Sequence, residues 1–257
     1  MKVGLVLSGG GARAAMHLGT IRALEEYGIE INLIAGTSAG AVVGALYAQG
    51  YTPEEGLEIV SEFKLFRTFQ IARGGNGLLS LSKAEQLLHP FFPENSFSSL
   101  RIPTLITATD IRRAETVSFD RGPLLPPMLA SCCLPGLFEP YSFQERQLVD
   151  GGVLNNMPVE YVEPHCDFII GAHCNPFQVN PTLKSAFEVA YRSLLLAVHN
   201  QNLRRLSKCN LLIEPPQLTR YSLFDFKKMK SIYQIGYEYA LQVLATADLP
   251  YTKKISC

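Results

Sequence analysis

The sequence predicts an α/β fold, a three-layer α/β/α domain whose central sheet is mostly parallel. Short apolar runs alternate with longer stretches of helical character along the chain. The first two runs, residues 2–7 and 31–35, are apolar throughout, as is typical of parallel strands buried on both faces. With 257 residues, 47% of them hydrophobic, the chain suits one large core. We therefore expect a single domain over 1–257.

The elements follow in order from these patterns. Strand 2–7 leads through a glycine turn into a helix over about 12–27, and strand 31–35 leads through a tight turn into a helix over 39–49. Such a unit implies parallel strands joined by a right-handed crossover. Further strands are predicted at 104–108, 115–119, 147–149, 168–172 and 211–213, and further helices at 83–88, 126–131, 183–206 and 226–245.

Two regions stand apart from this alternation. The stretch 62–99 is the least regular, with Gly-Gly-Asn-Gly at 74–77 and many aromatic residues around it. It resembles an insertion over the sheet, and such insertions often form lids. Residues 176–257 are predicted to form a mainly helical C-terminal part.

Composition excludes several classes of function. Lys+Arg and Asp+Glu both total 23, so the formal net charge is zero, and no basic stripe indicates a nucleic-acid partner. The apolar run at residues 3–7 is too short for a secretory signal, and residues 31–48 fit a strand, turn and helix better than a membrane span. We expect a cytoplasmic protein, peripheral to the membrane at most.

The cysteines indicate no metal centre. Six are present, at positions 132, 133, 166, 174, 209 and 257, with no C-x-x-C pair and no zinc-like cluster with histidine. We expect reduced structural thiols and no metal ligands.

Residues 36–40 read Gly-Thr-Ser-Ala-Gly and match the G-x-S-x-G pattern. A nucleophile elbow needs a strand, a sharp turn and a helix, so that the serine hydroxyl projects at the end of the strand. Gly36 and Gly40 relieve crowding at such a turn. An ordinary serine N-cap also fits the five residues alone. The apolar strand before them and the apolar helix after them favour Ser38 as a nucleophile.

Residues 8–13 read Ser-Gly-Gly-Gly-Ala-Arg and open the first predicted helix. Backbone N–H groups of Gly9, Gly10 and Gly11 can converge on an anion there, and acyl transfer needs such an oxyanion hole. Parallel strands would bring this loop to the sheet edge that carries Ser38.

A dinucleotide site is the rival interpretation of the glycine loop. It needs an acidic residue at the end of the second strand, about 20 positions further on. Glu30 lies before that strand, at the wrong end. No Gly-Lys-Ser/Thr follows either, so a P-loop fails, and we expect no nucleotide cofactor.

The proton acceptor for Ser38 is predicted to be Asp150. Asp150 ends a short apolar run, and Gly151 and Gly152 let the chain turn away, which presents a carboxylate at a sheet edge. Asp-Gly is also a common turn pair, and a carboxylate is a weak base unless it is removed from water. The five histidines lie within predicted helices, in the irregular insert or beside an apolar strand, where structural roles are favoured.

These motifs together resemble the patatin-like phospholipases, especially the short bacterial members. The resemblance extends to Ala-Ser-Cys-Cys-Leu-Pro-Gly-Leu-Phe-Glu-Pro at 130–140 and Asn-Asn-Met-Pro at 155–158. It implies a Ser–Asp dyad in which Ser38 attacks an acyl carbonyl and Asp150 takes its proton. It further implies that the Gly10 and Gly11 amides stabilise the oxyanion and that the substrate is a carboxylic ester, usually of a lipid.

One position departs from the family pattern, because Ala14 follows Arg13 where glycine is usual. An added methyl is tolerable if the site packs a helix against the sheet, but not if backbone must approach the substrate. Arg13 either binds a lipid phosphate or ties the loop to a neighbouring carboxylate, and we favour the latter.

Substrate and alternatives remain open at this point. Apolar residues of the insert are candidates for an acyl channel, although phenylalanines three apart on a helix more often face a core. The channel candidates are Phe63, Phe66, Phe69, Leu78, Leu79, Leu81, Phe91 and Phe92. Contact with a membrane surface is expected to be transient. A catalytically silent lipid- or acyl-binding protein, a thioesterase or a peptidase are the other hypotheses.

Overall fold

The computed structural model describes residues 1–62, 70–71, 79–81, 84–177, 179, 183 and 186–249. Its centre is an eight-stranded sheet with the order β10-β9-β1-β2-β5-β8-β7, and β6 pairs with β5 beside this path. The strands are β1 (Val3–Leu7), β2 (Leu33–Thr37), β5 (Thr104–Asp110), β6 (Glu115–Phe119), β7 (Tyr141–Phe143), β8 (Arg146–Asp150), β9 (Phe168–Ala172) and β10 (Leu211–Ile213). A separate pair joins β3 (Gln70–Ile71) to β4 (Leu79–Ser80).

The middle of the sheet is parallel and one end is antiparallel. Strands β10, β9, β1, β2 and β5 run in the same direction, whereas β6, β8 and β7 pair antiparallel. Leu7 lies opposite Gly36, so the carboxyl ends of β1 and β2 meet at one edge. The predicted α/β class with a mostly parallel sheet is confirmed.

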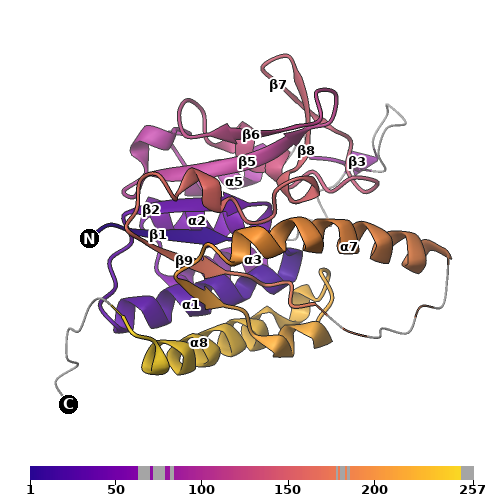
Figure 1. The fold of residues 1–257 in the computed structure, drawn as a ribbon. Helices are drawn as coiled ribbons and strands as arrows, with labels where there is room; N and C mark the ends of the chain where they lie inside the picture. Colours follow the sequence, from indigo (N-terminus) through magenta and orange to yellow (C-terminus); the bar gives the residue numbers. More distant parts are fainter. Residues whose placement is uncertain are drawn as a thin grey trace.

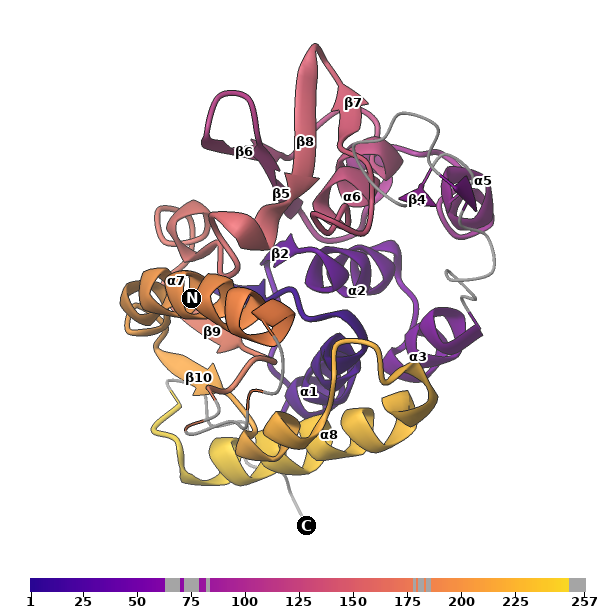
Figure 2. The ribbon, with the colours of Figure 1, turned by 90° about the vertical axis from the view of Figure 1, so that its right-hand side faces the viewer.

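Helices cover both faces of the sheet (Figures 1 and 2). Leu5 and Leu7 of β1 point into a core with helices α1 and α8, whereas Val6 points to the opposite face, toward Val162 and Leu206. Helix α7 lies on this second face, as Figure 2 shows. The helices are α1 (Ala15–Glu26), α2 (Ala39–Gln49), α3 (Pro53–Glu62), α5 (Ala84–Leu88), α6 (Leu125–Ser131), α7 (Ala186–Leu206) and α8 (Met229–Thr246).

Several predicted boundaries are wrong, for local reasons. The second strand runs two residues further than predicted because Gly36 and Thr37 pair with Ile106 and Thr107 of β5. The first helix begins with a 3-10 turn over Gly11–Ala14. Strands β6, β9 and β10 and helix α2 have the predicted bounds.

Helix α3 and strand β7 are among the elements that were not predicted. Helix α3 begins with a capping box in which Glu55 accepts from the Thr52 amide at 2.8 Å and Thr52 Oγ1 accepts from the Glu55 amide at 3.2 Å. The hairpin β7–β8 turns through Gln144 and Glu145, at φ 48° and 60°. Such a turn usually carries Asn-Gly, so this sequence offers no turn signal.

The predicted insert is described only in part. Phe63, Phe66, Phe69 and Leu78 lie outside the described residues, so the lid remains a prediction. Leu81 and Phe92 are 3% and 1% exposed and belong to the core that contains α2 and α6. These two side chains therefore pack in this core, and the acyl channel stays a prediction.

Among the described residues, no helix is both long and apolar enough to cross a bilayer. The cysteines at positions 132, 133, 166, 174 and 209 are all free thiols.

Candidate active site

Ser38 lies in a sharp turn between β2 and α2. Its backbone has φ 54° and ψ −129°, a conformation that is strained for a residue with a side chain. Close approach explains both neighbouring glycines. A Cβ at Gly36 would lie 2.7 Å from Ala41 Cα, and one at Gly40 would lie 2.5 Å from the Leu7 carbonyl oxygen. The turn has the geometry of a nucleophile elbow.

The sheet register brings Asp150 to Ser38. Thr37 lies opposite Thr107, and the next residue of β5, Ala108, lies opposite Asp150 at the end of β8. Ser38 Oγ donates to Asp150 Oδ2 at 2.6 Å. The other carboxylate oxygen, Oδ1, accepts from the Gly152 amide at 2.8 Å. Both oxygens of the carboxylate are thus held, one by the serine and one by backbone.

Burial makes Asp150 a stronger base than an ordinary aspartate. The residue is only 7% exposed. Loss of water raises the pKa of Asp150 to about 6, although the hydrogen bonds from Ser38 and Gly152 oppose this shift. The carboxylate is therefore ionised at neutral pH, and its pKa is closer to 7 than that of a solvated carboxylate, which suits a proton acceptor.

The glycine loop packs directly against the elbow. A Cβ at Gly9 would lie 2.7 Å from Ser38 Cβ, so only glycine fits there. The Gly9 amide donates to Asn156 Oδ1 at 3.0 Å. Within the described part of the chain, the amides of Gly10 and Gly11 have no hydrogen-bond acceptor. Two backbone donors of the glycine loop are therefore without a partner in this part of the chain.

Ser131 is a site residue that was not singled out from the sequence. Its hydroxyl accepts from the Ser38 amide at 2.7 Å and donates to the Thr107 carbonyl at 2.6 Å. The side chain thus ties the elbow to β5. Ser131 lies in the 130–140 block that carries the family resemblance, which was the available signal.

Arg13 holds the loop, but not through the carboxylate that we favoured. Its Nη2 donates to Asn175 Oδ1 at 2.5 Å, and Asn175 follows β9. The partner is neutral, and Asn175 was not singled out from the sequence. Ala14 beside it is 2% exposed and packs in the core with α1, so its methyl group does not face a substrate.

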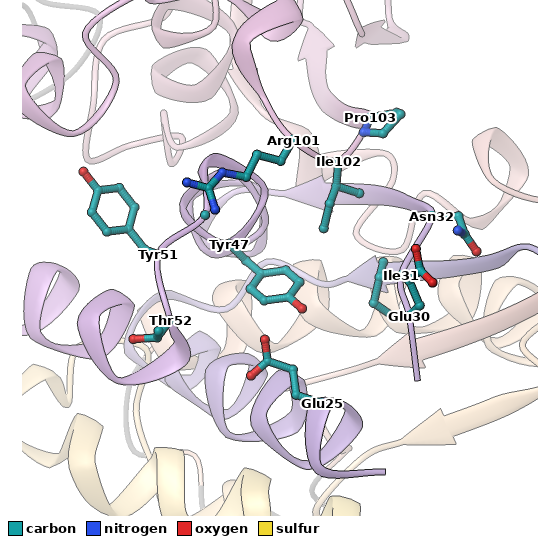
Figure 3. Close-up of a pocket in the computed structure, with 11 residues that line it drawn as sticks. Glu25, Glu30, Ile31, Asn32, Tyr47, Tyr51, Thr52, Arg101, Ile102 and Pro103 are labelled. Atoms are coloured by element: carbon teal, nitrogen blue, oxygen red, sulfur yellow. The ribbon is translucent and has the colours of Figure 1, made fainter. Parts of the chain in front are cut away.

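Two hollows lie at the opposite edge of the sheet from Ser38. One, of about 500 Å³, is drawn in Figure 3 and contains Asn32 and Pro103, the residues directly before β2 and β5. The other, of about 780 Å³, shares both residues. Ser38 follows the carboxyl end of β2, and Asp150 lies level with it, opposite Ala108 in the carboxyl-terminal half of β5. Neither hollow therefore belongs to the candidate active site.

The model of the patatin-like phospholipase family matches residues 5–162, which include the glycine loop, the serine elbow and Asp150. The chain belongs to this family.

Two relatives of this chain are longer proteins. An uncharacterized NTE family protein of Mycobacterium tuberculosis is 32% identical over 183 residues, which cover 70% of this chain and 51% of the relative. Lysophospholipase NTE1 of Kluyveromyces lactis is 30% identical over 272 residues, or 92% of this chain and 19% of the relative. The chain therefore spans about half of the first and a fifth of the second.

A solved structure shares the fold. VipD from Legionella pneumophila matches with a TM-score of 0.64 at 14% identity, covering 95% of this chain and 67% of that one. At this identity the likeness concerns the fold alone.

Proposed function

We propose that this chain is a serine lipid acyl hydrolase of the phospholipase A, lysophospholipase or esterase type, with Ser38 as nucleophile and Asp150 as base. The observation that carries the proposal is the 2.6 Å hydrogen bond from Ser38 Oγ to the buried Asp150 carboxylate, made by a serine in a strained elbow. Family membership supports a lipid ester as the substrate.

In the first half-reaction, Ser38 Oγ bonds to the ester carbonyl carbon while Asp150 takes the hydroxyl proton. The carbonyl oxygen becomes an oxyanion, which the Gly10 and Gly11 amides stabilise. The tetrahedral intermediate then expels the alcohol, whose oxygen recovers the proton from Asp150. Ser38 is left as an acyl ester.

In the second half-reaction, water replaces the alcohol. Asp150 takes a proton from the water as its oxygen attacks the acyl carbon. The bond to Ser38 Oγ breaks, Oγ regains the proton from Asp150, and a fatty acid leaves. One acid–base residue serves both halves, so histidine is not required.

The other hypotheses remain as outcomes of a test. A silent acyl-binding protein was motivated by Ala14, whose burial in the core removes that motive. A thioesterase would use the same dyad with a different leaving group. The proposal includes transient contact with a lipid surface for access to substrate.

The first test is intact-mass labelling with a fluorophosphonate. We expect one adduct on the wild type, none on Ser38→Ala and much slower labelling of Asp150→Asn. Ser207→Ala is the matched control, because this exposed hydroxyl donates to the nearby Arg204 carbonyl and lies outside the candidate active site. It should label as the wild type does.

Hydrolysis of phospholipid, lysophospholipid and acyl-thioester substrates then identifies the preferred leaving group. A well-folded wild type that binds acyl chains but forms no adduct would contradict the enzyme proposal and favour the binding protein.

A further inference from the structure

Asn175, outside the motifs of the sequence, bonds to the glycine loop in two places. Its Nδ2 donates to the Gly9 carbonyl at 2.6 Å, and its Oδ1 accepts from Arg13 Nη2 at 2.5 Å. Asn175 follows β9, so the pairing of β9 with β1 delivers it to the loop from a sequence distance of 166 residues.

Arg13 determines which way the Asn175 amide points. A guanidinium group has only donors, so it must face the amide oxygen. The NH2 group of Asn175 is then directed at the Gly9 carbonyl, which can only accept. The two bonds are consistent with a single orientation of the amide.

The Gly9 carbonyl and the Gly10 amide belong to one planar peptide unit. In a trans peptide the C=O and N–H bonds point in opposite directions. A donor that holds the Gly9 carbonyl on one side therefore directs the Gly10 N–H to the other side, and it also polarises that N–H group.

We propose that Asn175 is a positioning residue of the reaction, which holds the Gly9–Gly10 peptide so that the Gly10 N–H faces the oxyanion. This inference rests on the proposed function and adds a residue to it. Asn175 acts through the peptide and touches no reacting atom.

Other hydrogen bonds also hold the glycine loop in place, as expected of a preorganised oxyanion site. His17 Nε2 donates to the Ser8 carbonyl at 2.8 Å, and Ser8 Oγ accepts from the Cys174 amide at 2.9 Å. With the Gly9 amide bound to Asn156, the backbone groups next to Gly10 are already occupied. Preorganised donors of this kind need no rearrangement as the oxyanion forms.

Two weaker donors also approach the Gly9 carbonyl, Cys174 Sγ at 3.3 Å and Asn156 Nδ2 at 3.4 Å. Both distances indicate weak bonds beside that from Asn175. Loss of Asn175 should therefore misplace the peptide in part and lower turnover without abolishing it.

The decisive variant is Asn175→Asp. It has nearly the same size and keeps the acceptor for Arg13, but at neutral pH it has no donor for the Gly9 carbonyl. We expect kcat on a short-chain ester to fall about 10- to 100-fold, with KM within about twofold, because the lost interaction acts in the transition state. Asn175→Ala should lose a comparable factor.

A transition-state analogue separates positioning from a structural role. An alkyl trifluoromethyl ketone forms a tetrahedral oxyanion with an active serine, so its Ki should rise by the same factor as kcat/KM falls. The control is Asn32→Ala, which removes the 2.7 Å bond to the Val3 amide at the far edge of the sheet. It should lower the thermal midpoint and leave kcat and Ki unchanged.

The outcomes distinguish the two proposals. An active wild type whose Asn175→Asp variant keeps kcat and Ki within about twofold overturns the role of Asn175 and leaves the dyad intact. An unreactive wild type overturns both. If Asn175→Ala fails to fold, Asn175→Asp decides, because it retains the contact with Arg13.

Discussion

At the scale of single residues, Asp150 should control how activity depends on pH. Burial raises its pKa to about 6, and only the ionised carboxylate can accept the Ser38 proton. We expect kcat/KM to rise tenfold per pH unit below about 6 and to level off above about 7. Steady-state assays from pH 4.5 to 8.5 on a neutral ester measure this rise in kcat/KM. A profile that is flat below pH 6 would exclude Asp150 as the base.

The same burial makes Asp150 costly for stability. Its pKa rises from 3.8 in the unfolded chain to about 6 in the folded one, so the folded state binds more protons between these values. The unfolding free energy therefore falls as pH rises through this window, by about 3 kcal/mol in total.

Asp150→Asn should consequently stabilise the fold while it slows the reaction. We expect a gain of about 1–3 kcal/mol at pH 8, since the amide keeps the shape but carries no charge. Urea unfolding at pH 8 and pH 4.5 measures it, and the gain should shrink at the lower pH. A destabilised variant at pH 8 would mean that the bonds from Ser38 and Gly152 outweigh desolvation.

At the scale of elements, Ser131 joins the end of α6 to both β2 and β5. It satisfies the Ser38 amide and the Thr107 carbonyl together. Ser131→Ala leaves both groups without this partner, which should lower the free energy of unfolding by about 1–3 kcal/mol. We expect a lower thermal midpoint and slower fluorophosphonate labelling of Ser38, by about tenfold.

The control for Ser131 is Ser142→Ala in β7, an exposed serine whose hydroxyl accepts from Gln147. It should change neither the labelling rate nor the thermal midpoint. Equal labelling rates for Ser131→Ala and wild type would show that the elbow holds its shape without this tie.

At the scale of the whole molecule, buried His17 should make the fold sensitive to acid. Desolvation lowers its pKa to about 4, against 6.5 in the unfolded chain. The unfolded state binds more protons in this window, so stability is retained above about pH 6.5 and falls as pH drops toward 4. The loss from His17 between pH 7.5 and 5 is about 2 kcal/mol.

His17→Gln removes the titratable imidazole and with it this pH dependence. The variant should be less stable than the wild type at pH 7.5, because glutamine differs in shape from histidine and alters the hydrogen bond to the Ser8 carbonyl. Its unfolding free energy should nevertheless fall by about 2 kcal/mol less than that of the wild type on going to pH 5. Parallel losses in the two proteins would mean that His17 is not the acid-sensitive group.

The local motifs could be predicted because their causes lie within a few residues. A buried strand, a turn that needs small residues and an apolar helix predict the elbow around Ser38. The glycine loop is predicted in the same way, by glycines between an apolar strand and a helix. The parallel sheet follows from strands that are apolar on both faces. The pairing of Ser38 with Asp150 came from the family resemblance and the expected sheet edge.

The partners of these motifs became visible only in the folded chain. Ser131 reaches Ser38 across 93 residues, and Asn156 and Asn175 reach Gly9 across 147 and 166. No periodicity or turn signal encodes contacts over such distances. They arise because strands from distant parts of the chain pair in one register. That register brings Asp150 and Ser131 to Ser38, and the side chains of Asn156 and Asn175 to Gly9.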